Sequence, residues 1–396
     1  MKDNQAKYPQ LRFKGFTDPW VQRKFSNLVK KVGKHPSVPG DYTAYSVSNV
    51  DGLIPQTQQF DGSRLDVLDK SAYKVVNPGE FAYNPARINV GSVAYNDLEF
   101  PVLVSSLYVV VRMDQAIDDE FILQFIRSPQ FLKEVRRNTE GSVREYLFFD
   151  NFKNVRFPFA LNIEEQQKVG SFLRTMDDTI ALHQRKLAKL KELKQGYLQK
   201  LFPKNGSKFP QLRFAGFADA WEQRKLGDVV GEIQSGNRLP KDSLTSGNIP
   251  YVVAQTKNEG VFKTISKKTL DYNGNPMKLF PGNSISFSID NPKAMFYRST
   301  EFYTSNIMRV IHADYLSHQQ YLFILENMKS FTRRYDWSRK FSGPVVSNLE
   351  YLQPNEQEQC KIGSFILAFD NIITLHQRKL EKLQELKKGY LQKMFC

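Results

Sequence analysis

The chain has 396 residues, 56 basic and 41 acidic side chains, and a formal net charge of +15. Its length predicts more than one domain, and 13% aromatic residues exclude a chain too polar to form a core. Two cysteines exclude a disulfide scaffold and a Cys-based zinc finger, and they suit a reducing, cytoplasmic compartment. The polar first residues predict no signal peptide, and no stretch is apolar enough to span a membrane. The positive charge predicts a polyanionic partner, with nucleic acid ahead of a membrane.

The sequence is written twice. Residues 8–24 and 209–225 match at 12 of 17 positions, and residues 182–202 and 375–395 match at 17 of 21. The blocks between them share little beyond a Pro-Gly step, at Pro78-Gly79 and Pro281-Gly282. Two copies of roughly 200 residues do not suit a solenoid, whose repeats are about 20–50 residues long. We therefore predict two pseudo-symmetric halves, with a shared frame and divergent blocks.

The first predicted domain covers residues 1–161 and begins with the first shared segment. The stretches YKVVNPGEFAY and FPVLVSSLYVVVR are rich in β-branched and aromatic residues, which predicts strands. The stretch EFILQFIRSPQFLKEVRRN has the apolar spacing of helices. The block is therefore predicted to be α+β, with a small sheet followed by helices.

Polar loops and a basic cluster supply the candidate DNA contacts of this first block. Arginine suits guanine and asparagine suits adenine in the major groove, and basic side chains can also hold phosphates. The alternative for each residue is a solvated charge without a partner. The candidates in the first block are Asn84, Arg87, Asn89, Arg136, Arg137, Arg144 and Tyr146.

Residues 162–203 are predicted to form a long helix. Asn162 is expected to cap it, with Glu165 reaching back to the cap. Apolar residues then recur at alternating spacings of four and three, which indicates a coiled coil of roughly 57 Å over residues 164–201. His183 is interpreted as a seam residue that fixes register rather than as a catalytic or metal-binding group. The predicted seam residues of this helix are Ile180, His183, Leu187, Leu190 and Tyr197.

The second predicted domain covers residues 204–354, including the shared segment 209–225, and is also expected to be α+β. Basic residues crowd the stretch 329–340, where Tyr335 and Trp337 interleave with them. Two polar loops, 233–241 and 288–298, add further candidates. The candidate DNA contacts in this block are Asn237, Arg238, Lys241, Asn291, Lys293, Arg298, Arg333, Arg334, Arg339 and Lys340.

Residues 355–396 are predicted to repeat the long helix, with Asn355 and Glu358 as its cap. Each long helix leaves an apolar stripe that needs a partner, and both helices adjoin the second block, so they are predicted to pair antiparallel within the chain. Pairing between two chains remains an alternative. Cys360 and Cys396 are interpreted as incidental. The predicted seam residues here are Ile373, His376, Leu380, Leu383 and Tyr390.

Catalytic motifs are missing from the sequence. There is no phosphate-binding glycine loop, no H-E-x-x-H and no deaminase signature. Asn84-Pro85 and Asn291-Pro292 lack the second proline and the aromatic residue of an amino-methyltransferase tetrapeptide. We therefore predict a binding protein without catalytic residues, bound cofactor or metal. The net charge divides as +3, +4, +6 and +2 over residues 1–163, 164–204, 205–355 and 356–396, so both halves could meet DNA.

With the paired PQLRFxGFxxxW segments, YKVVNPGEFAYNPARINVGSVAYN and the twin LHQRKLxKLxELKxGYLQKxF helices, the chain resembles the specificity subunit of type I restriction–modification systems. This resemblance covers essentially the whole chain. It implies two target-recognition domains, each reading half of a bipartite site in double-stranded DNA. It also implies an antiparallel coiled coil that sets the spacer between the half-sites.

The resemblance further implies partner subunits. Two modification subunits would use S-adenosylmethionine to methylate adenine, and restriction subunits would use ATP and Mg²⁺ to translocate and cleave DNA. Two alternatives remain open: a stand-alone bipartite DNA-binding regulator, and a coiled-coil scaffold whose basic blocks bind protein. Co-purification with a methyltransferase subunit discriminates between the first reading and the alternatives.

Overall fold

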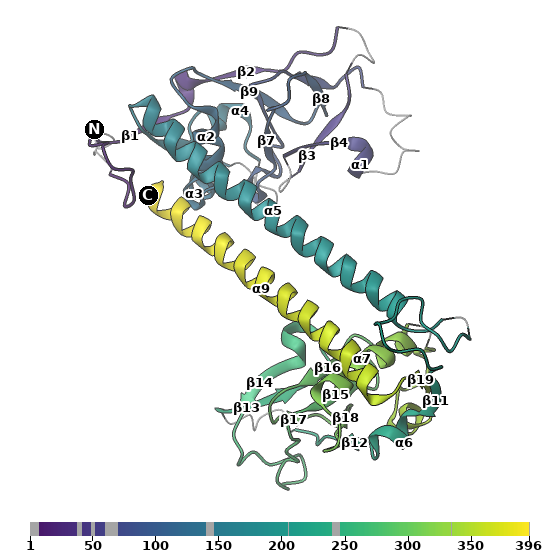
Figure 1. Ribbon diagram of the computed structural model, residues 1–396. Coiled ribbons are helices and arrows are strands. Elements are labelled where there is room, and N and C mark those ends of the chain that lie inside the picture. Colours follow the sequence, from purple (N-terminus) through teal and green to yellow (C-terminus); the bar gives the residue numbers. More distant parts are fainter. Residues whose placement is uncertain are drawn as a thin grey trace. The chain divides into compact units, whose positions relative to one another are not determined.

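A computed structural model describes residues 8–37, 42–48, 52–59, 70–139, 146–204, 206–239, 246–333 and 335–395 (Figure 1). The chain divides into two compact units. Unit 1 comprises residues 1–185 and 378–396, and unit 2 comprises residues 186–377. Each unit therefore contains one globular block and part of each long helix. Among the described residues, no helix is long and apolar enough to cross a lipid bilayer.

Unit 1 contains a mixed block of strands and helices, as expected. Its strands are β1 (Val21–Lys24), β2 (Val29–Val32), β3 (Tyr45–Ser48), β4 (Gly52–Pro55), β5 (Lys74–Val76), β6 (Phe81–Tyr83), β7 (Val93–Tyr95), β8 (Val102–Val104), β9 (Val109–Met113) and β10 (Arg156–Phe159). Its helices before the long one are η1 (Ser26–Leu28), α1 (Gln56–Gln59), η3 (Ile88–Val90), α2 (Asp119–Ile126), α3 (Pro129–Asn138) and α4 (Phe149–Phe152). The stretch predicted as helical forms two helices, α2 and α3, because Ser128 caps α3 just before Pro129.

Unit 2 contains an analogous block. Its strands are β11 (Glu222–Lys225), β12 (Gln234–Ser235), β13 (Ser246–Val252), β14 (Val261–Ile265), β15 (Ser284–Ser288), β16 (Met295–Arg298), β17 (Tyr303–Thr304), β18 (Met308–Ile311) and β19 (Glu350–Gln353). Its helices are α6 (Leu226–Val230), η4 (Lys257–Gly260), α7 (His318–Thr332) and α8 (Gly343–Ser347).

The two divergent blocks share a sheet topology that their sequences do not reveal. The main sheet has the order β2-β9-β6-β7 in unit 1 and β12-β18-β15-β16 in unit 2, with antiparallel pairing throughout. The Pro-Gly step precedes β6 in one unit and β15 in the other, so it marks equivalent turns. Gly79 has a φ of +80°, and a Cβ on Gly282 would lie 2.5 Å from the Ser299 carbonyl oxygen, so each turn requires glycine.

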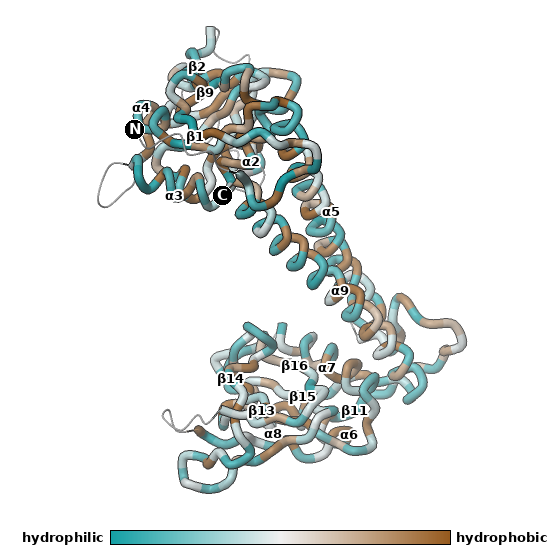
Figure 2. Tube along the Cα trace, turned by 90° about the vertical axis from the view of Figure 1, so that its left-hand side faces the viewer, coloured by the Kyte–Doolittle hydropathy of each residue, from teal (hydrophilic) through white to brown (hydrophobic). Residues whose placement is uncertain are grey.

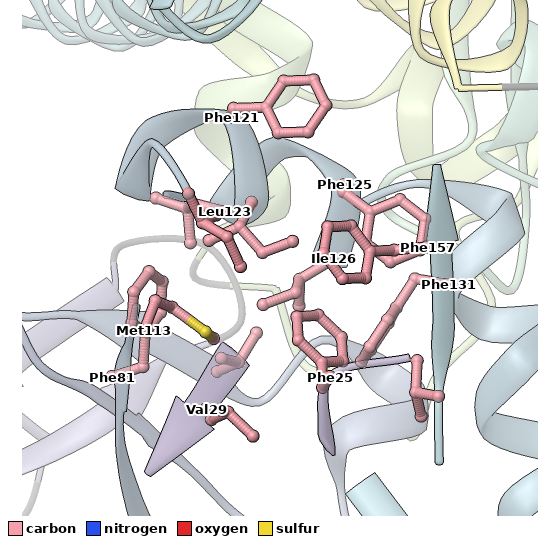
Figure 3. Close-up of a cluster of buried hydrophobic side chains, with 14 of the residues drawn as sticks. Phe25, Val29, Phe81, Met113, Phe121, Leu123, Phe125, Ile126, Phe131 and Phe157 are labelled. Carbon is pink, nitrogen blue, oxygen red and sulfur yellow. The ribbon is translucent and has the colours of Figure 1, made fainter. Parts of the chain in front are cut away.

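A ribbon of two strands closes each block. β1 pairs with β10 in unit 1, and β11 pairs with β19 in unit 2. Smaller sheets complete the blocks: β3-β4 and β5-β8 in unit 1, and β14-β13-β17 in unit 2. The core of unit 1 is aromatic. Phe25 stacks on Phe157 with ring centroids 4.6 Å apart, and Phe125 and Phe131 meet edge to face beside them (Figure 3).

The long helices are α5 (Ile163–Leu201) and α9 (Glu356–Met394), each of 39 residues. Figure 2 shows apolar and polar residues alternating along both of them. Asn162 and Asn355 accept hydrogen bonds from the backbone N–H groups of Glu164 and Glu358, at 2.8 and 2.9 Å, as the capping prediction requires.

The predicted role of Glu165 and Glu358 in the caps is wrong. Glu165 Oε1 and Oε2 accept hydrogen bonds from Arg12 at 2.5 and 2.8 Å, and Oε2 also accepts one from Trp20 Nε1 at 3.0 Å. Glu358 accepts the same pair of bonds from Arg213, at 2.8 and 2.7 Å. Charge-assisted bidentate pairs are stronger than a cap bond, so these carboxylates tie the shared segments to the helices.

The helices pair antiparallel within each unit, which confirms that prediction. In unit 1, Asp177 of α5 forms an ion pair with Lys387 of α9. In unit 2, Lys194 of α5 forms the equivalent ion pair with Asp370 of α9, at 2.6 Å. Equivalent ring contacts join Phe172 to Tyr390 in unit 1 and Tyr197 to Phe365 in unit 2. The same contacts thus recur with the roles of the two helices exchanged.

Burial along the seam follows the heptad pattern in part. Leu187 and Leu380 are buried, whereas Tyr197 stays partly exposed while its ring packs on Phe365 and Phe369. The other predicted seam residues are half-buried: Ile180, His183, Leu190, Ile373, His376, Leu383 and Tyr390. Burial lowers the pKa of Lys387 by more than the nearby Asp177 carboxylate raises it.

Each shared segment packs on the C-terminal end of a long helix. In unit 2, Leu212 N–H donates to the Lys200 carbonyl at 2.9 Å, and Phe202 packs on Trp221. In unit 1, the first segment uses the end of α9 in the same way. Leu11 N–H donates to the Lys393 carbonyl at 3.1 Å, and Phe395 packs on Trp20. Unit 1 is therefore completed by residues from far along the chain.

Candidate nucleic-acid interface

The loop between β6 and β7 presents one of the predicted residues of unit 1 to solvent. Asn84 is half-buried, and its Oδ1 accepts the Ala86 N–H at 3.0 Å, so it stabilises the turn. Asn89 is half-buried within η3. Arg87, between them, has an exposed side chain. Of this set, Arg87 is the residue best placed to reach a DNA molecule.

The C-terminal turn of α3 carries two exposed arginines of unit 1. Arg137 forms an ion pair with Glu134 of the same helix at 2.7 Å. Arg136 is exposed and forms no ion pair with the residues that the structure describes. Tyr146 lies parallel to Phe148, with ring centroids 5.5 Å apart. The backbone N–H of Leu147, between them, donates to the Pro85 carbonyl at 3.0 Å and ties this segment to the Arg87 loop. The predicted contact Arg144 lies outside the described residues.

Two predicted asparagines of unit 2 are loop ties. Asn237 donates to Asp271 Oδ2 at 3.0 Å and accepts the Lys278 N–H at 2.9 Å. Asn291 donates to the Ala254 carbonyl at 3.2 Å and accepts the Lys293 N–H at 3.1 Å. Their amides are therefore engaged internally. The neighbouring cations Arg238 and Lys293 are exposed, and Lys241 falls outside the described residues.

Arg298 belongs to the core of unit 2, so we correct its assignment as a DNA contact. Its guanidinium donates to Ser286 Oγ at 2.8 Å and to the Glu259 carbonyl at 2.5 Å, and it also packs over the Phe296 ring. Burial lowers the pKa of Arg298 to about 10. A buried charge with these internal partners cannot turn outward without leaving the Glu259 carbonyl and Ser286 unbonded.

The basic cluster after α7 is exposed. Arg333 is the C-cap residue of α7, and Arg339 and Lys340 follow in the next loop with solvent-facing side chains. The Tyr335 hydroxyl donates to the Lys340 carbonyl at 3.1 Å and gives this loop a defined shape. The predicted contact Arg334 is not among the residues that the structure describes.

Sequence reasoning missed a second basic surface in unit 2. Exposed lysines occur on β14 and on the segments next to the β14-β13-β17 sheet. Asp271, an acidic residue of the same stretch, is buried. The signal was present in the sequence, since residues 257–278 contain five lysines against Glu259 and Asp271. We call this surface the lysine group: Lys257, Lys263, Lys267, Lys268 and Lys278.

The long helices also expose leucines outside their seam. Leu182 and Leu375 are 60% and 67% exposed, and they occupy equivalent positions of the two copies. Leu193 and Leu386 form a second equivalent exposed pair. Leu386 lines a groove of about 480 Å³ in unit 1 together with Leu11, Gly389 and Tyr390. The same leucine positions are therefore exposed in both copies of the long helix.

Comparison with known proteins identifies a family with this arrangement of two mixed blocks and two long helices. The model of the type I restriction modification DNA specificity domain matches residues 7–192 and 218–385. The chain therefore belongs to the family of type I restriction–modification specificity subunits, and DNA sequence specificity is the role of this family.

Individual relatives support the same assignment. The chain is similar to the type I restriction enzyme MjaVIII specificity subunit of Methanocaldococcus jannaschii, with 22% identity over 311 residues, which is 72% of each protein. Its fold is similar to the crystal structure of the type I restriction–modification S subunit from M. genitalium, with a TM-score of 0.64, 14% identity, and coverage of 98% and 99% of the two chains. A chain from a structural study of complex assembly in the type I R-M system matches with a TM-score of 0.56, 15% identity and the same coverage.

Proposed function

We propose that each unit reads one half of a bipartite site in double-stranded DNA. The observation that carries this proposal is the shared sheet topology of the two divergent blocks, mounted on equivalent ends of the long helices. Equivalent frames give equivalent docking on DNA, whereas different loops give different base contacts. Half-sites on one face of B-DNA lie about 34–36 Å apart, and the roughly 57 Å length of each helix is sufficient for that spacing.

Selection from a duplex library tests the bipartite reading. The full chain, purified with the methyltransferase subunit encoded nearest to it, is used to select from duplexes randomised over about 30 base pairs, a span that covers both half-sites. We expect a motif with two specified halves and an unspecified spacer. One continuous motif, or none, contradicts the proposal.

The lysine group is proposed to bind phosphates in the half-site of unit 2. Lys263→Gln with Lys268→Gln removes two exposed cations, neither of which forms an ion pair with a residue that the structure describes. Since each phosphate contact contributes about 0.9 to the salt slope, the slope of log K against log salt should fall by about 1.8. Fluorescence anisotropy with a labelled duplex at several salt concentrations measures this slope. Lys14→Gln is the control, because the equivalent position of the other copy is Ala215; an unchanged slope in the double variant would remove the lysine group from the DNA contact.

The partner proposal concerns the exposed leucines of the helices. Two copies of a modification subunit each place an apolar helix against one of the equivalent faces, around Leu182 and Leu193 on α5 and around Leu375 and Leu386 on α9. Gly389 supports close approach on this face, since a Cβ there would meet no atom within 4 Å. The modification subunits supply S-adenosylmethionine for adenine methylation, and restriction subunits supply ATP- and Mg²⁺-dependent cleavage.

Introducing a carboxylate on this face tests the docking. Leu182→Asp should remove one modification subunit from the assembly, and Leu182→Asp with Leu375→Asp should remove both, because a carboxylate replaces an apolar contact that becomes buried. Native mass spectrometry of the co-expressed proteins counts the subunits. Leu107→Asp, at a residue that is 74% exposed in the block of unit 1, is the matched control. If both helix variants retain two modification subunits, docking occurs elsewhere.

A further inference from the structure

The segment after β12 is fixed tightly to a neighbouring loop in unit 2. A Cβ on Gly236 would lie 2.2 Å from the Thr304 carbonyl oxygen, so only glycine allows the approach. The next residue, Asn237, donates its backbone N–H to Thr304 at 3.0 Å and bridges Asp271 and the Lys278 backbone with its side chain. Asp271 Oδ1 in turn accepts two backbone N–H groups of its own loop, from Asn273 and Asn275, both at 2.9 Å.

Arg238 and Tyr272 project from this rigid base. The Tyr272 N–H donates to the Arg238 carbonyl at 2.8 Å, which fixes the two backbones together. The Arg238 guanidinium lies over the Tyr272 ring, 4.8 Å from its centroid. The Arg238 side chain is exposed and Tyr272 is 62% exposed. The guanidinium therefore has a defined direction while its N–H donors stay open to solvent.

The charge around this pair suits a polyanion. Lys278 is attached to the same base through Asn237, and the other members of the lysine group are exposed on β14 and on the segments just before and after it. Asp271, the carboxylate of this base, is buried and accepts hydrogen bonds from Asn237, Asn273 and Asn275. Arg238 is exposed and forms no ion pair with the described residues. Its charge is therefore available to a polyanion such as DNA rather than to an internal partner.

We propose that Arg238, held in position by Tyr272, reads a guanine in the DNA half-site recognised by unit 2. A guanidinium presents two parallel N–H donors that match O6 and N7 of guanine in the major groove, which lysine cannot reproduce. Stacking on Tyr272 restricts the arginine before DNA binds, so less side-chain entropy is lost on contact. This inference rests on the proposed function and adds one reading residue, its positioning residue and the base that is read.

The experiment compares motifs selected from the randomised duplex library by the wild-type assembly and its variants. The wild type should specify a guanine in the second half-motif, with a preference of about 5- to 150-fold over other bases. Arg238→Ala and Arg238→Lys should both lose this preference at that one position and leave the first half-motif intact. Arg238→Lys retains the charge, so it separates base reading from phosphate attraction.

The positioning role of Tyr272 has its own readout. Tyr272→Ala should weaken the same guanine preference several-fold without removing it, and Tyr272→Phe should restore it because the ring face is retained. The matched control is Arg23→Ala in unit 1, where a guanidinium also lies 4.8 Å from a ring centroid, that of Phe159, but the ring is buried. This variant should leave the second half-motif unchanged.

The outcomes distinguish a failure of base reading by Arg238 from a failure of bipartite DNA recognition. A bipartite wild-type motif whose second half lacks guanine, or keeps its guanine preference in Arg238→Lys, overturns the role of Arg238 and leaves the proposed function standing. If Tyr272→Ala and wild type select with equal preference, Tyr272 has no positioning role. A wild-type assembly that selects no bipartite motif overturns both the inference and the proposed function.

Discussion

Exchanging residues 226–349 for the matching block of another specificity subunit changes one half of the recognised DNA sequence and leaves the other half unchanged. The exchanged stretch begins after β11 and ends before β19, so the ribbon and the shared segment remain native. The Arg213–Glu358 pair and the packing of Phe202 on Trp221 therefore persist in the chimaera. Each base pair of the old half-site that no longer matches should cost about 1–3 kcal/mol of binding free energy.

The donor block must satisfy one steric condition. A Cβ on Gly363 of α9 would lie 2.1 Å from the Gln319 carbonyl oxygen, so the first turn of α7 packs directly on the helix backbone. A donor with the same close approach should fold on the native helices. Footprinting and library selection measure the result, and the reciprocal exchange of residues 26–155 is the control for unit 1. A chimaera altered in both half-sites would argue against independent reading by the two blocks.

Arg12→Met destabilises unit 1 strongly, because it removes two hydrogen bonds from the buried Glu165 carboxylate. Removing one partner of a buried ion pair costs about 3–5 kcal/mol. Arg213→Met should cost more in unit 2. Glu358 loses the equivalent two bonds in that variant. Glu165 keeps a third bond, from Trp20 Nε1, whereas Trp221 Nε1 has no hydrogen-bond partner among the described residues and so supplies no such bond to Glu358. Hydrogen exchange in increasing urea, followed on peptides of each unit, separates the two effects.

A double variant provides the control for this comparison. Replacing both partners, as in Arg12→Met with Glu165→Met, should recover much of the stability because no unpaired charge remains buried. Hydrogen bonding to Glu165 and Glu358 raises the pKa of Arg12 and Arg213, so both guanidinium groups stay protonated. A loss below 1 kcal/mol in Arg12→Met would show that other groups compensate the Glu165 charge.

The long helices could be predicted from the sequence because their information is local. Heptad spacing, repeated almost unchanged in the second copy, specifies a helix and its apolar stripe. The order of the segments along the chain then implies antiparallel pairing. The two ion pairs agree with it, since Lys194 of α5 pairs with Asp370 of α9 and Lys387 of α9 pairs with Asp177 of α5. The capping glutamates were misread since Arg12 is 153 residues from Glu165 in the chain, a distance at which spacing carries no signal.

The common topology of the blocks could not be predicted for a different reason. A sheet order depends on which strands alternate in burial, and many sequences satisfy the same alternation. The turn before β6 and β15 requires glycine in both copies, which agrees with the Pro-Gly step that the two otherwise divergent blocks share. The two stretches of the first block predicted as strands contain β5, β6, β8 and β9, and the stretch predicted as helical contains α2 and α3, but the order of the strands in the sheet was not predicted.

The candidate DNA contacts were predicted least well, because a residue can contact DNA only if its side chain is exposed and not engaged within the chain. Asn84, Asn237 and Asn291 have the chemistry to read adenine, but the structure uses their amides in loops. Arg298 has the chemistry to read guanine, but it is buried. The lysine group was overlooked since its members are spread over residues 257–278, on a strand and its flanking segments, and only the structure shows that each of them is exposed.

The dependence of unit 1 on residues 378–395 has a consequence for protein synthesis. At about 5–20 residues per second, a ribosome needs about 10–40 s to translate residues 186–377. During this time the core of unit 1 lacks Tyr390, Met394 and Phe395, which have not yet been synthesised. Trp20 and Phe121 lack their final packing partner throughout that interval. All residues of unit 2 are synthesised before residues 378–396, which unit 1 needs. Unit 2 can therefore finish folding before unit 1, although the block of unit 1 is translated first. A stop codon near residue 378 would therefore damage the domain at the beginning of the gene rather than the one beside it.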